Sequence, residues 1–288
     1  MERHIFKFGS NSVALIVPKR WLDKNGLKPS STVYVSESES GNLIVSAAET
    51  AKREAEKVVT SKTRPSFISR WVGLHYMYGT GRLRVYSADG LTQAQVDGIE
   101  AKINVECPGF EITSQSSNDL VMEDLTDIRE IDLDRIISRL RSLINQEFVE
   151  FISGDQKSVP KIERLVNRFY MLGMRYVNIT QAKDALMYFG VLEMLEAISD
   201  KLEVVSVGTA IKNKQVFEEL RAAFALCPDA MAGDSEALEK VAQMREEIIR
   251  KLPHRTKDDT QTKMLREVID SISSIAEFGL RFEDVSNK

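Results

Sequence analysis

The spacing of hydrophobic positions changes twice along the chain, and each change marks a new kind of structure. In residues 1–50 short apolar runs alternate with polar turns, which is typical of short strands. The predicted strands are 5–8, 13–17, 32–35 and 43–45. Residues 19–25 are predicted as a short helix, because Pro18 suits a first helical turn and Gly26 a helix end. The turn Gly41-Asn42 between the last two strands predicts a hairpin. Such small sheets usually gain stability by dimerising.

A second pattern fills residues 51–127, where segments typical of helices alternate with segments typical of strands. The charged residues 52–57 lead into it. The predicted helices are 65–78 and 92–104, and the predicted strands are 82–86, 110–114 and 120–123. Thr92 followed by Gln95 forms a capping box before the second helix. The alternation predicts a small α/β segment. Gly79-Thr80-Gly81 is interpreted as a turn, because the residues of a phosphate-binding loop do not follow it.

Residues 128–288 carry apolar positions three or four apart, which is the spacing of one helix face. The first predicted helix shows this spacing in Ile137, Leu140, Ile144, Phe148 and Phe151. A second helix is expected to begin near Ser158, and Pro228 and Pro253 mark later breaks. Six helices in two sets of three predict a bundle with an internal repeat of about 80 residues. The predicted fold is therefore multidomain, with a β domain (1–50), an α/β segment (51–127) and an all-α six-helix bundle of two three-helix repeats (128–288).

The composition is that of a soluble protein that can bury cores, with 43% hydrophobic and 28% charged residues among 288. The formal net charge of -4 excludes a uniformly basic nucleic-acid coat but allows a basic face on one domain. No apolar run approaches the ~20 residues of a membrane span, and the N-terminus has no secretory pattern. Cys107 and Cys227 are far apart and predict neither a disulfide framework nor a zinc site. We therefore expect a cytoplasmic protein without a membrane span, with two reduced cysteines.

The N-terminal segment carries a resemblance to a known family. It lies in residues 8–21, FGSNSVALIVPKRW, followed by Gly26-Leu27 and residues 33–35. This order of elements resembles the AbrB/SpoVT/MazE swapped-hairpin family. A strand ending in Ile-Val-Pro-Lys comes first, and a short helix, Gly-Leu and a second hairpin follow it. Members of this family are DNA-binding dimers in which the hairpins of two chains interleave. Ser30-Ser31 stands where the family usually has Gly-Asp, and the Arg that bacterial members often carry in the first hairpin is absent. The resemblance implies a homodimer through this domain and DNA as the partner.

The cations of this domain are the candidates for contacts to DNA phosphates. They are Arg3, Lys7, Lys19, Arg20, Lys24 and Lys28. If two copies met at a two-fold axis, each cation would occur twice on the dimer. The resulting positive face would replace the counterions of DNA phosphates. The candidate contacts are Lys7, Lys19 and Arg20, with Ser10, Asn11 and Ser12 as donors from the turn. The alternative is that these cations only keep a small sheet soluble, and the resemblance alone favours DNA binding over it.

Three segments of the helical part carry a second resemblance. They are residues 162–171, IERLVNRFYM, residues 192–200, LEMLEAISD, and a weaker echo at residues 272–279. These segments are similar to the PhoU family, whose members are six-helix bundles of two three-helix repeats. Joined to a swapped-hairpin domain through an α/β segment, such a bundle resembles an archaeal phosphate-uptake regulator.

The PhoU resemblance also implies iron or zinc clusters held by carboxylates in the pattern E-x-x-x-D, because residues four apart share a helix face. In this chain the corresponding positions are Glu163 and Asn167, Glu193 and Ala197, and Ser273 and Glu277. Half of the acids are therefore replaced, and the histidines are isolated in the sequence. We expect that the clusters are lost and that the protein has no cofactor. Glu196 and Asp200 form a new pair four residues apart, which on a helix usually faces water.

Two further expectations concern catalysis and anion binding. Arg164, Arg168 and Arg175 are expected to form a solvated helix face rather than an anion site. No nucleophile, base and orienting residue form a recognisable local arrangement, so we expect no enzyme.

The predicted function is a DNA-binding transcriptional regulator, of phosphate uptake or a related nutrient response, whose bundle senses a signal or docks on a partner. The alternative is an adaptor that docks on a phosphate transporter or a sensor protein, with the small sheet serving only to dimerise. A third interpretation, a metal-storage bundle, is disfavoured by the missing acids.

Overall fold

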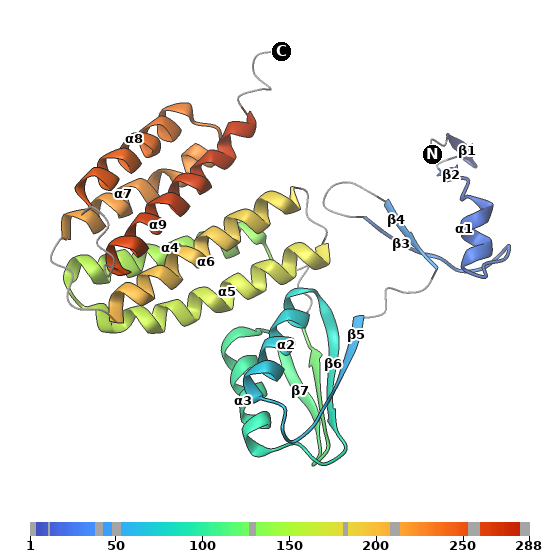
Figure 1. Ribbon diagram of the computed structural model, residues 1–288. Helices are drawn as coiled ribbons and strands as arrows, with labels where there is room; N and C mark the ends of the chain where they lie inside the picture. The colour runs from blue at the N-terminus through green and yellow to red at the C-terminus, as the bar shows by residue number, and fades with distance from the viewer. Residues whose placement is uncertain are drawn as a thin grey trace. The chain divides into compact units, whose positions relative to one another are not determined.

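The computed structural model describes residues 4–10, 12–37, 43–47, 53–126, 131–180, 184–207, 214–252 and 260–282 (Figure 1). The chain divides into two compact units, Met1–Lys52 and Arg53–Lys288. In the described ranges, short strands come first, a sheet covered by helices follows, and the remainder is helical. The predicted order of a small β part, a central α/β segment and a helical C-terminal region is thereby confirmed. No helix in these ranges is long and apolar enough to cross a membrane.

The N-terminal unit contains antiparallel hairpins of short strands. Strand β1 (Ile5–Phe8) pairs with β2 (Ser12–Leu15), and β3 (Tyr34–Glu37) pairs with β4 (Leu43–Ser46). The predicted hairpin of the last two strands is confirmed. β2 is shorter than the apolar run that predicts it, and β3 begins later than predicted.

A short helix lies between the hairpins in sequence, as predicted. Helix α1 (Lys19–Lys24) follows Pro18 and is succeeded by Gly26, whose φ of 65° suits a residue without a side chain. The turn residues Asn11 and Gly41-Asn42 lie outside the described residues.

The central sheet has the strand order β5-β6-β8-β7. Its elements are β5 (Arg53–Val59), α2 (Pro65–Met77), β6 (Thr80–Ser87), α3 (Gln93–Glu106), β7 (Phe110–Gln115) and β8 (Asp119–Asp124). β5 and β6 are parallel, with α2 as their crossover, whereas β8 is antiparallel to both of its neighbours. Helices α2 and α3 lie on one face of the sheet (Figure 1). The capping box of Thr92 and Gln95 at the start of α3 is confirmed.

The charged segment 52–57 is not merely a lead-in, and that prediction is wrong, because Arg53 begins strand β5. Ala55 and Val59 pack against the core beneath the helices. Glu54 and Glu56 instead form ion pairs with arginines of β6, at 3.5 Å and 2.8 Å. The period of two that defines a strand is therefore present in the burial pattern, but Lys57 on the partly buried side and exposed Val58 interrupt it in the sequence.

The described helical region contains six α-helices longer than four turns. They are α4 (Leu133–Ser153), α5 (Val159–Thr180), α6 (Ala185–Val207), α7 (Lys214–Met231), α8 (Ser235–Lys251) and α9 (Thr260–Glu277). Short 3-10 turns cover Gln156–Ser158 and Phe278–Phe282. Consecutive helices pack on one another from α4 to α6 and from α7 to α9, and α6 also packs on α9. Ser158 lies in the turn before α5, where its hydroxyl donates to the Asp155 carbonyl at 3.1 Å.

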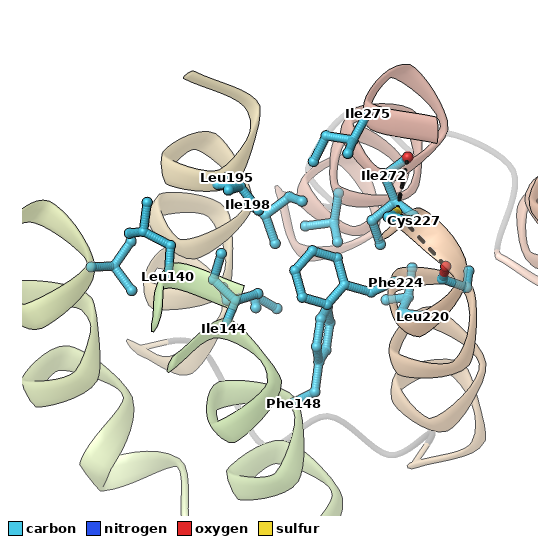
Figure 2. Packing of buried hydrophobic residues seen from close by; sticks show 14 of the residues in the cluster. Leu140, Ile144, Phe148, Leu195, Ile198, Leu220, Phe224, Cys227, Ile272 and Ile275 are labelled. Atoms are coloured by element: carbon cyan, nitrogen blue, oxygen red, sulfur yellow. Dashed lines mark hydrogen bonds between the residues drawn. The ribbon is translucent and has the colours of Figure 1, made fainter. Parts of the chain in front are cut away.

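One apolar core runs through this helical region. Figure 2 shows Phe148 of α4 facing Phe224 of α7, with ring centroids 5.8 Å apart. Phe151 stacks on Phe217 of α7 at 4.4 Å. Since α4, α6, α7 and α9 all contribute fully buried residues, the core connects the first half of the region with the second.

Pro228 does not end a helix at that point, contrary to the prediction, because α7 continues to Met231. The preceding Cys227 is buried, and its thiol lies within hydrogen-bonding distance of the carbonyls of Ala223 and Ile272, at 3.8 Å and 3.6 Å (Figure 2). Cys227 and Cys107 are both free, and both are buried. Pro253 lies outside the described residues.

Arg175 joins the helical region to the central sheet. It is 2% exposed and donates to the carbonyls of Tyr76, at 2.6 Å, and Thr80, at 3.1 Å. Its guanidinium forms an ion pair with Asp124 of β8. The expectation of a solvated arginine face is therefore wrong at Arg175, because this side chain replaces its water contacts with buried carbonyls and a carboxylate.

Candidate functional site

The N-terminal unit exposes the apolar side chains of its strands. None of its described residues is buried. The large exposed apolar residues are Ile5, Phe6, Phe8, Val13, Leu15, Ile16, Val33, Tyr34, Val35 and Leu43. A two-stranded hairpin is at best marginally stable in water, and folding that leaves these side chains in solvent gains little from the hydrophobic effect. The described residues of this unit therefore gain little stability from their own packing.

The candidate DNA contacts lie on two elements of this unit. Lys7 is exposed on β1, directly opposite Val13 of β2, and Ser12 is exposed at the start of β2. Ser10 is exposed in the intervening turn, and Asn11 lies outside the described residues. Lys7 and Ser12 thus lie in neighbouring register pairs, so their side chains point to opposite faces of the hairpin.

Lys19 and Arg20 form the first turn of α1 and are exposed. That turn contains no acidic residue, and a cation at a helix N-terminus opposes the helix dipole by about 0.3–1 kcal/mol. The position of these two cations is therefore not explained by the stability of α1. A bound anion close by would offset the repulsion.

The positions named from the PhoU resemblance form hydrogen bonds within or between helices. Glu163 of α5 is buried and accepts a hydrogen bond from the Asn167 amide. Glu193 of α6 accepts from the Tyr170 hydroxyl at 2.6 Å. Ser273 of α9 is buried and donates to Glu277 at 3.3 Å. Ala197 supplies only its carbonyl, to the Lys201 ammonium at 3.0 Å. In the described part of the chain no group of three or more His, Cys, Asp or Glu residues is arranged to hold a metal ion.

A buried carboxyl group near these positions escaped the sequence analysis. Glu147 of α4 is 0% exposed, accepts a hydrogen bond from the Ser199 hydroxyl at 2.7 Å, and has a buried Oε2 atom with no hydrogen-bond partner among the described residues. Burial raises its pKa to about 8, and the nearby Glu163 and Glu203 add to the effect. The sequence contains one indication of this burial. Glu147 lies three residues after Ile144 and four before Phe151, so it falls on the apolar face of its helix.

Other carboxyl groups of α5 and α6 are perturbed in the same direction. Burial raises the pKa of Glu163 and of Glu196 to about 7, and it raises that of Asp200 as well. Asp200 is the second cause for Glu196, because the two acids lie four residues apart on α6. Asp200 is exposed but Glu196 is partly buried, so the expectation that this pair faces water holds for one member. The region can bind protons near neutral pH.

Comparisons with known proteins add no relative. No protein-family model, no curated protein and no solved structure matches the chain.

Proposed function

We propose that the protein is a DNA-binding transcriptional regulator that acts as a homodimer through its N-terminal unit. The observation that supports this most directly is the absence of any buried residue among the described residues of this unit, combined with exposed Lys7, Lys19 and Arg20. A second copy whose hairpins interleave with the first would cover the apolar strands. It would also double the cations on one side of the dimer.

The proposed contacts to DNA are electrostatic. Lys7, Lys19 and Arg20 of each copy bind backbone phosphates and release counterions, and Ser10, Asn11 and Ser12 donate from the turn. Phosphate contacts position a protein on the duplex, whereas base contacts supply sequence preference. The proposed contacts therefore account for binding to the DNA backbone and not for the choice of an operator sequence.

The helical region is proposed to be the sensing or docking part. We interpret α4 to α6 and α7 to α9 as two three-helix repeats of a six-helix bundle, which is the arrangement of the PhoU family. The packing of consecutive helices within each set supports this interpretation. The resemblance connects the regulator with phosphate uptake or a related nutrient response. The protein is proposed to work without a metal cofactor, since Asn167, Ala197 and Ser273 stand at ligand positions.

Charge reversal at the start of α1 tests the proposal. Lys19→Glu combined with Arg20→Glu is compared with the original chain for binding to a fluorescent duplex from the protein's own promoter. We expect a loss of at least about tenfold in affinity, because four phosphate contacts per dimer become repulsive. Lys240→Glu on the exposed surface of α8 is the matched control and leaves binding unchanged.

Sedimentation must show that the double variant keeps the oligomeric state of the original chain. Unchanged DNA affinity in an intact dimer overturns the proposed site. If the original chain does not bind DNA at low salt, the regulator is rejected in favour of an adaptor that docks on a transporter or sensor protein.

A further inference from the structure

Helix α2 of the central segment presents an uncovered row of large apolar side chains. Phe67 is 51% exposed, Leu74 is 47% exposed and Tyr78, at the C-terminal cap, is 58% exposed. Partly buried Trp71 lies between them in sequence, so the row follows the spacing i, i+4, i+7 and i+11 of one helix face. The opposite side of α2 is buried in the core of the sheet. The exposed row is therefore not a consequence of a poorly packed helix.

Among the described residues, the charged side chains that border this row are cationic. The Lys57 ammonium lies 5.1 Å from the centroid of the Phe67 ring. The Arg53 guanidinium donates to the Tyr78 carbonyl at 3.2 Å, at the C-terminal end of the row. Arg64 is exposed at the N-terminal cap and Arg70 is exposed within the helix.

No carboxylate compensates these cations from the helix itself. The segment Pro65–Met77 contains no Asp or Glu. The two acids of the neighbouring strand β5, Glu54 and Glu56, are engaged by Arg82 and Arg84 of β6. Burial and the nearby Lys57 lower the pKa of His75, so this imidazole is neutral at pH 7 and does not change the sign of the surface. The α2 face is thus an apolar row with a positive border.

We propose that the α2 face (Phe67, Trp71, Leu74 and Tyr78) is a docking surface for an amphipathic helix of a partner protein, whose apolar ridge is bordered by Asp and Glu. The row extends over about 16 Å, the length of three helical turns. A straight row of this spacing is what a second helix contacts when ridges pack into grooves. The carboxylates of the partner would meet Lys57, Arg53 and Arg70.

Two other occupants fit less well. A second copy of the same face, related by a two-fold axis, would bring cationic borders together and would be repelled. Single-stranded nucleic acid is bound by stacking of bases on aromatic rings. Here the Lys57 ammonium already lies over Phe67, and the His75 ring lies against Trp71 with centroids 4.5 Å apart. One face of the Phe67 ring is therefore taken, a tilted His75 ring limits access to Trp71, and the aliphatic Leu74 between the aromatic residues offers no stacking surface.

The test uses the full chain and three fluorescent peptides of about 18 residues, a length that supports a helix. The first places Leu at i, i+4, i+7 and i+11 and Glu on both sides of that row. The second replaces each Glu by Lys. The third contains the residues of the first in an order that destroys the row. We expect the first peptide to bind at low salt, and the other two to bind at least about tenfold more weakly.

Variants locate the binding on the protein. Phe67→Ser, Leu74→Ser and Arg70→Glu are each expected to weaken the first peptide about tenfold or more. These side chains are exposed, so the variants fold, and the thermal unfolding midpoint confirms it. Leu186→Ser on α6, where the side chain is 86% exposed, is the matched control and leaves peptide binding unchanged.

Several results overturn the proposal, which goes beyond the DNA-binding function and does not depend on it. One is an equal affinity for all three peptides, or for the original chain and the α2 variants. Another is that the first peptide does not bind at all. A third is a single-stranded oligonucleotide that binds through Phe67 and Leu74 while the acidic peptide does not. A fourth is a self-association that Leu74→Ser abolishes, which would assign the face to a second copy.

Discussion

At the scale of single residues, Glu147 shows how an acidic side chain can be kept in an apolar core. Its carboxyl group is fully buried among α4, α5 and α6, and in the part of the chain that the structure describes it accepts a hydrogen bond from the Ser199 hydroxyl alone, at 2.7 Å. An ionised carboxylate in such a place is costly, so the group binds a proton instead. Glu163 and Glu196 on the neighbouring helices have raised pKa values for the same reason. The interface of these helices is therefore sensitive to pH.

Replacement of Glu147 by Gln tests this account. The folded protein binds the Glu147 proton more tightly than the unfolded chain does, because the pKa is raised from 4.5 to about 8. Stability from this group is fully present below pH 4.5 and is lost as pH rises towards 8. Glu147→Gln keeps an acceptor for Ser199 and never ionises. We expect its melting temperature to exceed that of the original chain by several degrees at pH 8, and the gain to vanish near pH 4.5.

Glu150→Gln on the same helix, where the side chain is only partly buried, is the control for this measurement. It should leave the difference in melting temperature between the two pH values unchanged. The account of Glu147 is contradicted if Glu147→Gln has the same pH profile as the original chain.

Arg175 carries a second prediction at this scale. Its buried guanidinium binds Asp124 and the carbonyls of Tyr76 and Thr80, so removing it takes a buried donor from the two carbonyls and the cation from the ion pair with Asp124. Arg175→Met is expected to lower the free energy of unfolding by about 3–5 kcal/mol. Urea unfolding measures this, and Arg168→Met, which removes an exposed arginine of the same helix, is the control. A loss below about 1 kcal/mol would show that the buried ion pair is not what holds this junction.

At the scale of elements, the hairpins of the N-terminal unit are proposed to form the dimer interface. Phe8 is 70% exposed on β1, and in an interleaved dimer it would be covered by the second chain. Phe8→Asp is therefore expected to shift the protein from dimer to monomer in sedimentation, because a buried carboxylate without a cation is unfavourable. Val58→Asp on β5, where Val58 is 64% exposed outside this unit, is the control and leaves the dimer intact. A Phe8→Asp protein that stays dimeric contradicts dimerisation through the hairpins.

Which elements could be predicted from sequence depends on what defines them. Helix α3 was predictable because Thr92 and Gln95 cap it locally, and α4 because its buried residues recur every three or four positions. The sequence does not predict strand β5, because Glu54 and Glu56 occupy exposed positions on the solvent-facing surface of the sheet. The alternation of apolar and polar residues that usually indicates a strand is therefore hard to recognise. Pro228 is typical of a helix break, but it lies in the last turn of α7, where few helical hydrogen bonds follow.

The candidate site was predictable only in part, for similar reasons. Lys7, Lys19 and Arg20 could be named because they flank a recognisable strand and turn pattern. The pairing of Arg175 with Asp124 could not, because it joins residues 51 positions apart whose contact exists only after the sheet and the helices have packed. The partner of Glu147 was hidden in the same way, since Ser199 lies 52 positions further along the chain.

At the scale of the whole molecule, the two units differ in how they are stabilised. The unit Arg53–Lys288 contains two apolar cores, one beneath α2 and α3 and one among α4 to α9, and Arg175 connects them. The unit Met1–Lys52 has exposed apolar strands and exposed cations instead. In the proposed regulator, a signal received by the larger unit would change the balance between dimer arrangements that bind DNA well and poorly.

The measurement that tests this account most directly is a salt titration of binding to the promoter duplex. If Lys7, Lys19 and Arg20 of two copies contact phosphates, the logarithm of the binding constant falls against the logarithm of salt concentration with a slope of about -5. Lys19→Glu with Arg20→Glu should make that slope clearly shallower as well as weaken binding. An identical slope in the double variant, or no binding by the original chain at low salt, would contradict the account.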